Sequence, residues 1–228
     1  MQLYIGNKNY SSWSMRPWVL MRQAGIPFEE VQILFDSFGP ESRFKRELQR
    51  VSPAGRVPVL VEDDGFAVWD TLAIAEYLAE KFPDRKLWPA APKARARARS
   101  LCAEMHSGFG ALRTHCPMNI QASLPEVGQR VVAEQAAARD DLARIVQMWS
   151  QQLAESGGPM LFGEFSIADA YFAPVASRIR TYALPVPADV AAYVERVFAL
   201  PGVHAWVLEA LEEKQFLDFE EPYRTART

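Results

Sequence analysis

The chain has 228 residues, of which 49% are hydrophobic and 23% are charged, a composition that excludes a fibrous or largely disordered protein. Its 25 Lys and Arg and 28 Asp and Glu give a formal net charge of -3, so there is no excess of positive charge for binding nucleic acid. The length allows two domains or one large one, and either can bury a sizeable core.

The first residues run directly into the apolar Leu3, Tyr4 and Ile5, without the basic region and apolar core of a signal peptide. No later apolar run is long enough to span a bilayer. Cys102 and Cys116 lack the spacing of a CxxC motif or of a Cys/His site, so we expect neither a disulfide nor a metal. We therefore expect a cytoplasmic protein without a membrane partner.

The first predicted elements are a strand, a loop and a helix. The strand covers residues 3–5, and the helix follows Ser11-Ser12-Trp13-Ser14 and ends near Gly25. Pro17 has no amide hydrogen and is tolerated only in the first turn of a helix. The helix therefore begins among the serines, and one of them is a candidate N-cap.

The next predicted elements are a strand over residues 31–35, a short helix over 43–50, strands over 57–62 and 66–69, and a helix over 71–82. The first of these strands follows from alternating apolar residues at Val31, Ile33 and Phe35. Asp63-Asp64-Gly65 separates the two later strands, and an Asp-Gly pair between apolar runs is typical of a hairpin. These two strands should be antiparallel.

Pro83, Pro89 and Pro92 interrupt this pattern, and we assign residues 83–92 to a linker. The remainder is predicted to be helical over residues 93–115, 126–156, 167–182, 189–199 and 203–214. Residues 220–228 are expected to form a loose tail. The order is therefore βαβαββα and then helices, which predicts an α/β domain over 1–82 and an all-α domain over 93–228.

The segment Ser52-Pro53-Ala54-Gly55-Arg56-Val57-Pro58-Val59-Leu60 resembles the Asn-Pro-x-Gly-x-Val-Pro-x-Leu stretch of the cytosolic glutathione transferase superfamily. The resemblance implies a thioredoxin-like α/β N-terminal domain, an all-α helical-bundle C-terminal domain, and glutathione as co-substrate. It also implies a cis Val57-Pro58 bond, with the Val57 backbone paired to the cysteinyl backbone of glutathione. The alternative is that Pro58 only marks a strand edge.

Asp70-Thr71 resembles the acidic-Ser pair that binds the γ-glutamyl end of glutathione in this superfamily. The chemistry fits, because a carboxylate can accept from the ligand's ammonium group. A hydroxyl and the free amides at a helix N-terminus can bind its carboxylate. Taken alone, the pair can also be read as an ordinary helix N-cap.

Tyr10-Ser11-Ser12-Trp13-Ser14-Met15-Arg16 resembles the Ser-Ser-Cys-Ser-Trp-Arg segment of the zeta class and serine-type bacterial relatives. The resemblance makes Ser11 the catalytic hydroxyl, with Ser12 as second choice. A serine that donates to the glutathione sulfur at the positive end of a helix stabilises the thiolate, whose unperturbed pKa is about 8.5. The nucleophile is then the ligand's own sulfur. The alternative is that these serines only cap the helix, and we expect Arg16 to be structural.

Two further features lie in the helical half. Ser166 and Asp169 match the superfamily's capping box, which satisfies the amides at the start of a buried helix. Candidates for the second-substrate pocket, which should lie between the domains, are Trp13, Met105, His106 and Phe109. His106 can equally be an ordinary helix residue.

The sequence thus favours a glutathione transferase that conjugates glutathione to an electrophilic small molecule. A glutathione-dependent cis-trans isomerase resembling maleylacetoacetate isomerase is one alternative, and a non-catalytic glutathione- or ligand-binding protein is another. The resemblance also implies a homodimer.

Overall fold

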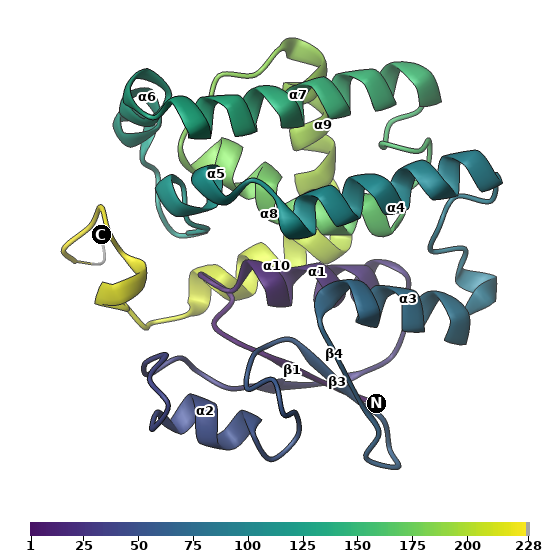
Figure 1. The fold of residues 1–228 in the computed structure, drawn as a ribbon, viewed down its shortest axis with the longest axis vertical. Helices are drawn as coiled ribbons and strands as arrows, with labels where there is room; N and C mark the ends of the chain where they lie inside the picture. The colour runs from purple at the N-terminus through teal and green to yellow at the C-terminus, as the bar shows by residue number, and fades with distance from the viewer. Residues whose placement is uncertain (227–228) are drawn as a thin grey trace.

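A computed structural model of the protein describes residues 1–226, and it has an α/β half below a helical half in the view of Figure 1. The elements of the α/β half are β1 (Gln2–Ile5), α1 (Ser12–Gln23), β2 (Glu29–Gln32), α2 (Arg43–Leu48), β3 (Val59–Val61), β4 (Ala67–Trp69) and α3 (Thr71–Lys81). The strand order is β2-β1-β3-β4, with β1 parallel to β2 and β3 antiparallel to both β1 and β4. The order of elements and the hairpin are as predicted.

The boundaries of β2 and β3 differ most from the prediction. β2 ends at Gln32, so Ile33 and Phe35 follow the strand, although both side chains are buried as the alternation indicated. β3 begins at Val59 and not at Val57, because Pro58 has no amide hydrogen to donate to the sheet. The Val57-Pro58 peptide bond is cis, as the resemblance implied.

The other half is helical, with η1 (Pro83–Arg85), α4 (Pro92–Ser107), α5 (Gly110–His115), α6 (Pro125–Glu134), α7 (Ala136–Ser156), α8 (Ile167–Thr181), α9 (Ala188–Ala199), α10 (Pro201–Glu212) and η2 (Asp218–Glu220). Two helices predicted as continuous are broken. Phe109 has a left-handed backbone (φ 57°), which ends α4 before α5 begins. Gln135 (φ -107°, ψ 85°) likewise separates α6 from α7.

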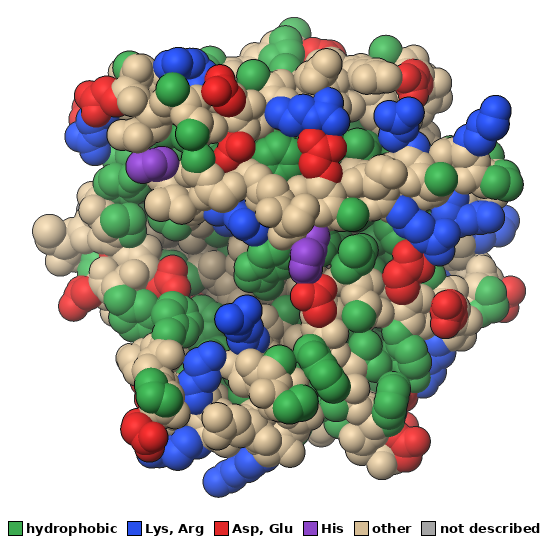
Figure 2. Space-filling model, in the orientation of Figure 1, with side chains coloured by type: hydrophobic (Ala, Val, Ile, Leu, Met, Phe, Trp, Pro, Cys, Tyr) green, Lys and Arg blue, Asp and Glu red, His purple; other side chains and the backbone are tan. Residues whose placement is uncertain are grey.

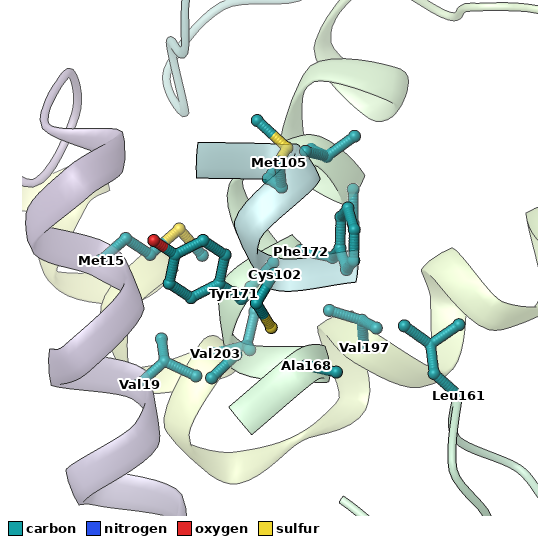
Figure 3. Packing of buried hydrophobic residues seen from close by; sticks show 14 of the residues in the cluster. Met15, Val19, Cys102, Met105, Leu161, Ala168, Tyr171, Phe172, Val197 and Val203 are labelled. Atoms are coloured by element: carbon teal, nitrogen blue, oxygen red, sulfur yellow. The ribbon is translucent and has the colours of Figure 1, made fainter. Parts of the chain in front are cut away.

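The predicted capping box holds the start of α8, the helix buried at the centre of the molecule. The Asp169 carboxylate accepts hydrogen bonds from the Ser166 amide at 2.9 Å, the Leu161 amide at 3.1 Å and the Tyr193 hydroxyl at 2.9 Å. Figure 3 shows how α8 then places Tyr171 toward α1 and Phe172 toward the helical core. The fold class is therefore the thioredoxin-like sheet joined to a helical bundle that the sequence predicted.

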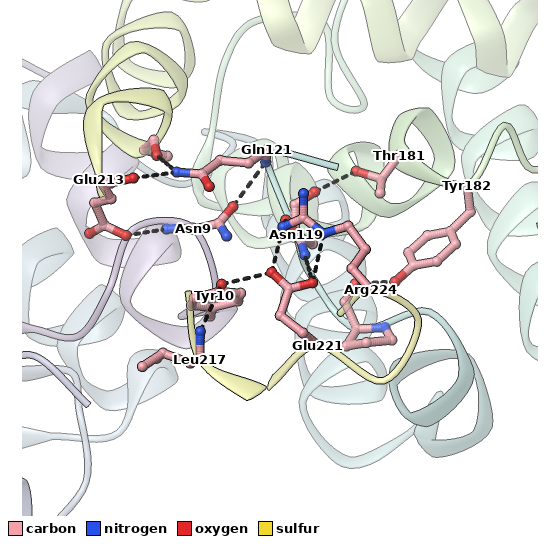
Figure 4. A network of polar contacts seen from close by, with 12 residues as sticks. Asn9, Tyr10, Asn119, Gln121, Thr181, Tyr182, Glu213, Leu217, Glu221 and Arg224 are labelled. Carbon is pink, nitrogen blue, oxygen red and sulfur yellow. Dashed lines mark hydrogen bonds and ion pairs between the residues drawn. The ribbon is translucent and has the colours of Figure 1, made fainter. Parts of the chain in front are cut away.

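The prediction of a loose tail over residues 220–228 is wrong for the part of this segment that the structure describes. Glu221 is buried, and it accepts hydrogen bonds from the Tyr10 hydroxyl at 2.7 Å, from Asn119 Nδ2 at 2.8 Å and from Arg224 Nε at 2.8 Å (Figure 4). Tyr10 anchors the segment to the α/β half and Asn119 to the helical half, while residues 227–228 lie outside the described part. Within residues 1–226, no helix is long and apolar enough to cross a membrane.

Candidate functional site

Two adjoining cavities lie between the α/β half and the helical half, and Figure 2 shows this face hollowed between them. The first, of about 610 Å³, is called the polar cavity and is lined by Trp13, Ala54, Arg56, Val57, Pro58, Trp69, Asp70, Thr71, His106 and Arg113. The second, of about 570 Å³, is called the aromatic cavity and is lined by Tyr10, Ser11, Ser12, Trp13, Phe35, Phe38, Phe44, Lys45, Arg56, Val57, Arg113, Pro117, Met118, Arg178 and Glu220. Trp13, Arg56, Val57 and Arg113 line both.

The polar cavity contains four of the five residues predicted to bind glutathione, namely Val57, Pro58, Asp70 and Thr71, while the fifth, Ser11, lines the aromatic cavity. Asp70 is the N-cap of α3, where its Oδ1 accepts from the Leu72 amide at 3.0 Å, and it has a positive φ of 74°. Its other oxygen lies 3.5 Å from His106 Nε2. The free amides of the α3 N-terminus and the Asp70 carboxylate therefore offer sites for both an anion and a cation.

Tyr171 links the polar cavity to the core of the molecule, and no role for it was foreseen from the sequence. Its hydroxyl lies 2.8 Å from Thr71 Oγ1 and 2.9 Å from His106 Nδ1. Burial raises the pKa of Tyr171 to about 12, so its single proton goes to one of these partners at neutral pH. One phenol from α8 thus fixes a side chain of α3 and one of α4.

The serine cluster lies where the loop after β1 enters α1. Ser11 Oγ and Ser14 Oγ are 2.7 Å apart, and either can be the donor. Ser14 Oγ also accepts from the Gly6 amide at 3.1 Å. If Ser14 donates to Ser11, the Ser11 proton is free to point into the aromatic cavity, which both Ser11 and Ser12 line.

Arg16 makes structural contacts, as expected. Its Nε donates to the Tyr171 carbonyl at 2.9 Å and its Nη1 to the Ser12 carbonyl at 3.0 Å. The guanidinium also lies 4.1 Å from the centre of the Trp13 ring. Burial lowers the pKa of Arg16 to about 9, which leaves it charged at neutral pH.

The aromatic cavity combines an apolar wall with ionisable groups. Phe35, Phe38 and Phe44 pack edge to face on one another. The Tyr10 phenol already donates to Glu221, and burial together with that carboxylate raises the pKa of Tyr10 to about 12. Tyr10 is therefore a poor source of an anionic hydroxyl, and Ser11 and Ser12 carry the other hydroxyls that line this cavity.

The four residues predicted for the second-substrate pocket are separated in the structure. Trp13 lines both cavities and His106 lines the polar one. Met105 and Phe109 are buried in the hydrophobic core and are not among the described residues that line either cavity. Sequence reasoning missed Arg178, although a charged residue on the buried face of a predicted helix was a signal.

The comparisons with known proteins agree with this geometry. Family models of the glutathione S-transferase N-terminal and C-terminal domains match residues 10–81 and 132–209. The chain is 30% identical to rat maleylacetoacetate isomerase over 173 residues, which cover 75% of this chain and 74% of that protein. It is 32% identical to a probable maleylacetoacetate isomerase of Caenorhabditis elegans, but over only 47% of each chain.

Solved structures are similar over nearly the full length. A glutathione transferase homologue from Burkholderia, with bound glutathione, has a TM-score of 0.70 and 28% identity, covering 93% of this chain and 98% of that one. A glutathione transferase from Methylococcus capsulatus has a TM-score of 0.67 and 25% identity, covering 92% and 98%.

Proposed function

Since the chain belongs to the glutathione S-transferase family, we propose that it binds glutathione in the polar cavity and joins its sulfur to an electrophilic small molecule in the aromatic cavity. The observation that carries this proposal is that the two cavities meet at Val57 and Trp13. A peptide whose cysteine backbone pairs with Val57 can therefore present its sulfur to Ser11 and Ser12. The serine-type assignment belongs to the same proposal.

The ends of glutathione have complementary groups in this site. We assign its ammonium group to Asp70 and its γ-glutamyl carboxylate to Thr71 and the α3 amides. Arg56 lines both cavities beside Val57, and Lys45 Nζ lies 2.7 Å from the Gly55 carbonyl nearby. These two cations suit the glycyl carboxylate.

Ser11 is proposed to stabilise the thiolate by donating its proton as a hydrogen bond, while Ser14 donates to Ser11. The thiolate then forms the new carbon–sulfur bond, and the electrophile's leaving group departs with its electron pair. The start of α1 adds the positive end of a helix dipole. No group on the protein is itself the nucleophile.

The test is the pKa of the bound glutathione thiol, measured from thiolate ultraviolet absorbance. A hydrogen bond to a charged group contributes about 1.5–3 kcal/mol, so Ser11→Ala should raise that pKa by about one to two units and slow conjugation of an aryl halide by about tenfold to a hundredfold. Ser100→Ala, on the exposed face of α4, is the control. If Ser12→Ala gives the shift and Ser11→Ala does not, Ser12 is the donor; if neither does, the serine proposal fails.

A glutathione-dependent isomerase is the second candidate, because the chain is 30% identical to rat maleylacetoacetate isomerase. Turnover of a maleyl-diketo acid without net consumption of glutathione would favour it. Retention on immobilised glutathione without either activity would favour a protein that only binds.

A further inference from the structure

Arg178 is a buried cation on the wall of the aromatic cavity. Its side chain is 3% exposed, and two hydrogen bonds fix its guanidinium group: Nε donates to the Cys116 carbonyl at 2.9 Å and Nη1 to the Pro174 carbonyl at 3.2 Å. Both acceptors are neutral, and within residues 1–226 no carboxylate forms an ion pair with Arg178 and Nη2 has no hydrogen-bond partner. Burial lowers the pKa of Arg178 to about 10, so it is charged at neutral pH.

Burying an unpaired charge is unfavourable, and folded proteins usually provide such a charge with an opposite one. Arg113, on α5, lines the same cavity and likewise forms no ion pair in the described part of the chain; its guanidinium lies 5.5 Å from the Trp13 ring. The carboxylate among the lining residues is Glu220, and burial, together with the charge of Glu221, raises its pKa to about 7. The cavity therefore keeps an excess of positive charge at neutral pH.

Glutathione leaves Arg178 unused in the binding mode proposed above. Arg56 and Lys45 come from the α/β half and are assigned to the glycyl carboxylate, whereas Arg178 comes from α8 in the helical half. Like Lys45, Arg178 lines the aromatic cavity and is not among the residues that line the polar one. Its charge is therefore available to the second substrate. Phe35, Phe38 and Phe44 supply an apolar wall in the same cavity.

We propose that the second substrate is a small unsaturated or aromatic electrophile that carries a carboxylate, and that Arg178, assisted by Arg113, binds that carboxylate. The inference rests on the proposed function, because it requires glutathione in the polar cavity. The carboxylate accepts from Nη2 of Arg178, and the unsaturated body packs against the phenylalanines. A cavity of about 570 Å³ is within the usual range for such a ligand.

The test compares 4-chloro-3,5-dinitrobenzoate with its methyl ester, which lacks the charge. Each kcat/KM is divided by the rate constant of the uncatalysed reaction with glutathione, because the ester group activates the ring more strongly than the carboxylate does. Charge-assisted hydrogen bonds should give the wild type about a tenfold to hundredfold higher kcat/KM for the acid. Arg178→Met should reduce this preference to about threefold or less, and Arg178→Lys should restore part of it. Arg180→Met, on the exposed side of the same helix, should leave the preference unchanged.

Calorimetry separates this inference from the proposed function. The glutathione conjugates of the acid and of the ester are titrated into each variant, so the preference is measured even if the enzyme turns over neither substrate. Glutathione alone should bind wild type and Arg178→Met equally. If the substitution instead disrupted the folded structure, the affinity for glutathione would fall as well. Should Arg178→Met fail to fold, Arg113→Gln and Arg178→Lys test the inference in its place. Each of them is expected to weaken the preference for the acid over the ester. Equal binding of the two conjugates to the wild type overturns the inference.

Discussion

Neighbouring residues Glu220 and Glu221 have opposite pKa shifts because their surroundings differ. Desolvation by burial, with the charge of Glu221, raises the pKa of Glu220 to about 7. Glu221 is desolvated too, but hydrogen bonds from Arg224, Tyr10 and Asn119 hold its pKa below the usual value. Near neutral pH, Glu220 is therefore partly protonated while Glu221 is ionised.

This difference predicts how stability depends on pH. The pKa of Glu220 is about 7 in the folded protein and about 4.3 in the unfolded chain, so the folded state favours the protonated form. Its contribution is full below about pH 4 and is lost as the pH rises toward 7. We expect the free energy of unfolding of the wild type to fall by on the order of 3 kcal/mol relative to Glu220→Gln between about pH 4 and 8, as measured by urea titration. Glu212→Gln, at an exposed site, is the control; parallel curves for wild type and Glu220→Gln would contradict the assignment.

The packing of α6 on the end of α8 depends on a missing side chain. A Cβ added to Gly128 would lie 1.8 Å from the Tyr182 carbonyl oxygen, so α6 approaches this backbone too closely for any larger residue. Gly128→Ala should therefore destabilise the protein by about 3 kcal/mol in chemical denaturation, at the upper end of overpacking effects. Gly110→Ala in α5 is the matched control, because a Cβ there meets nothing within 4 Å.

Replacing Gly by Ala within a helix usually stabilises the protein. Gly110→Ala should therefore leave the free energy of unfolding unchanged or raise it by up to about 1 kcal/mol. Equal effects of the two substitutions would mean that the α6 contact is looser than 1.8 Å implies.

The elements that sequence predicted well are those with strong local signals. Asp63-Asp64-Gly65 forms the expected turn, with the Gly65 amide donating to the Glu62 carbonyl at 2.9 Å, and the Ser166/Asp169 box begins α8. The break at Phe109 was missed although Gly108, the C-cap of α4, and Gly110 flank it, and a glycine at this place is a common signal for the end of a helix. Local patterns therefore predicted the order of elements better than their boundaries.

At the scale of the whole molecule, the site is formed by residues that are distant in the sequence. The motifs at Val57 and Asp70 that resemble those of glutathione transferases were recognisable because each is a short contiguous stretch. Arg178, Glu220 and Phe38 meet in one cavity only after the helical half and the C-terminal segment fold over the α/β half. No spacing in the sequence indicates that convergence, so the aromatic cavity could be recognised only in the structure.

Lys8 is a buried junction between the same two halves. Its Nζ donates to Glu30 Oε1 at 2.6 Å, on β2, and also to Glu209, on α10. The ammonium group lies 5.1 Å from the Trp18 ring centre and 5.8 Å from that of Trp206, while Trp206 Nε1 donates to the Lys8 carbonyl at 3.1 Å. One side chain therefore connects a strand and two helices across the interface.

Removing the Lys8 cation should lower the stability of the whole molecule and not of one half alone. Lys8→Met leaves the partly buried Glu30 carboxylate without its cation, and breaking a buried pair in this way costs about 3–5 kcal/mol. Because both halves contact Lys8, circular dichroism and tryptophan fluorescence should report one shared unfolding transition, moved to lower denaturant. Lys93→Met, at an exposed site, should unfold like the wild type. Adding Glu30→Gln to Lys8→Met should recover part of the loss, since the uncompensated charge is then gone; a double variant no more stable than Lys8→Met would show that Lys8 acts through its packing on the two tryptophans and not through the ion pair.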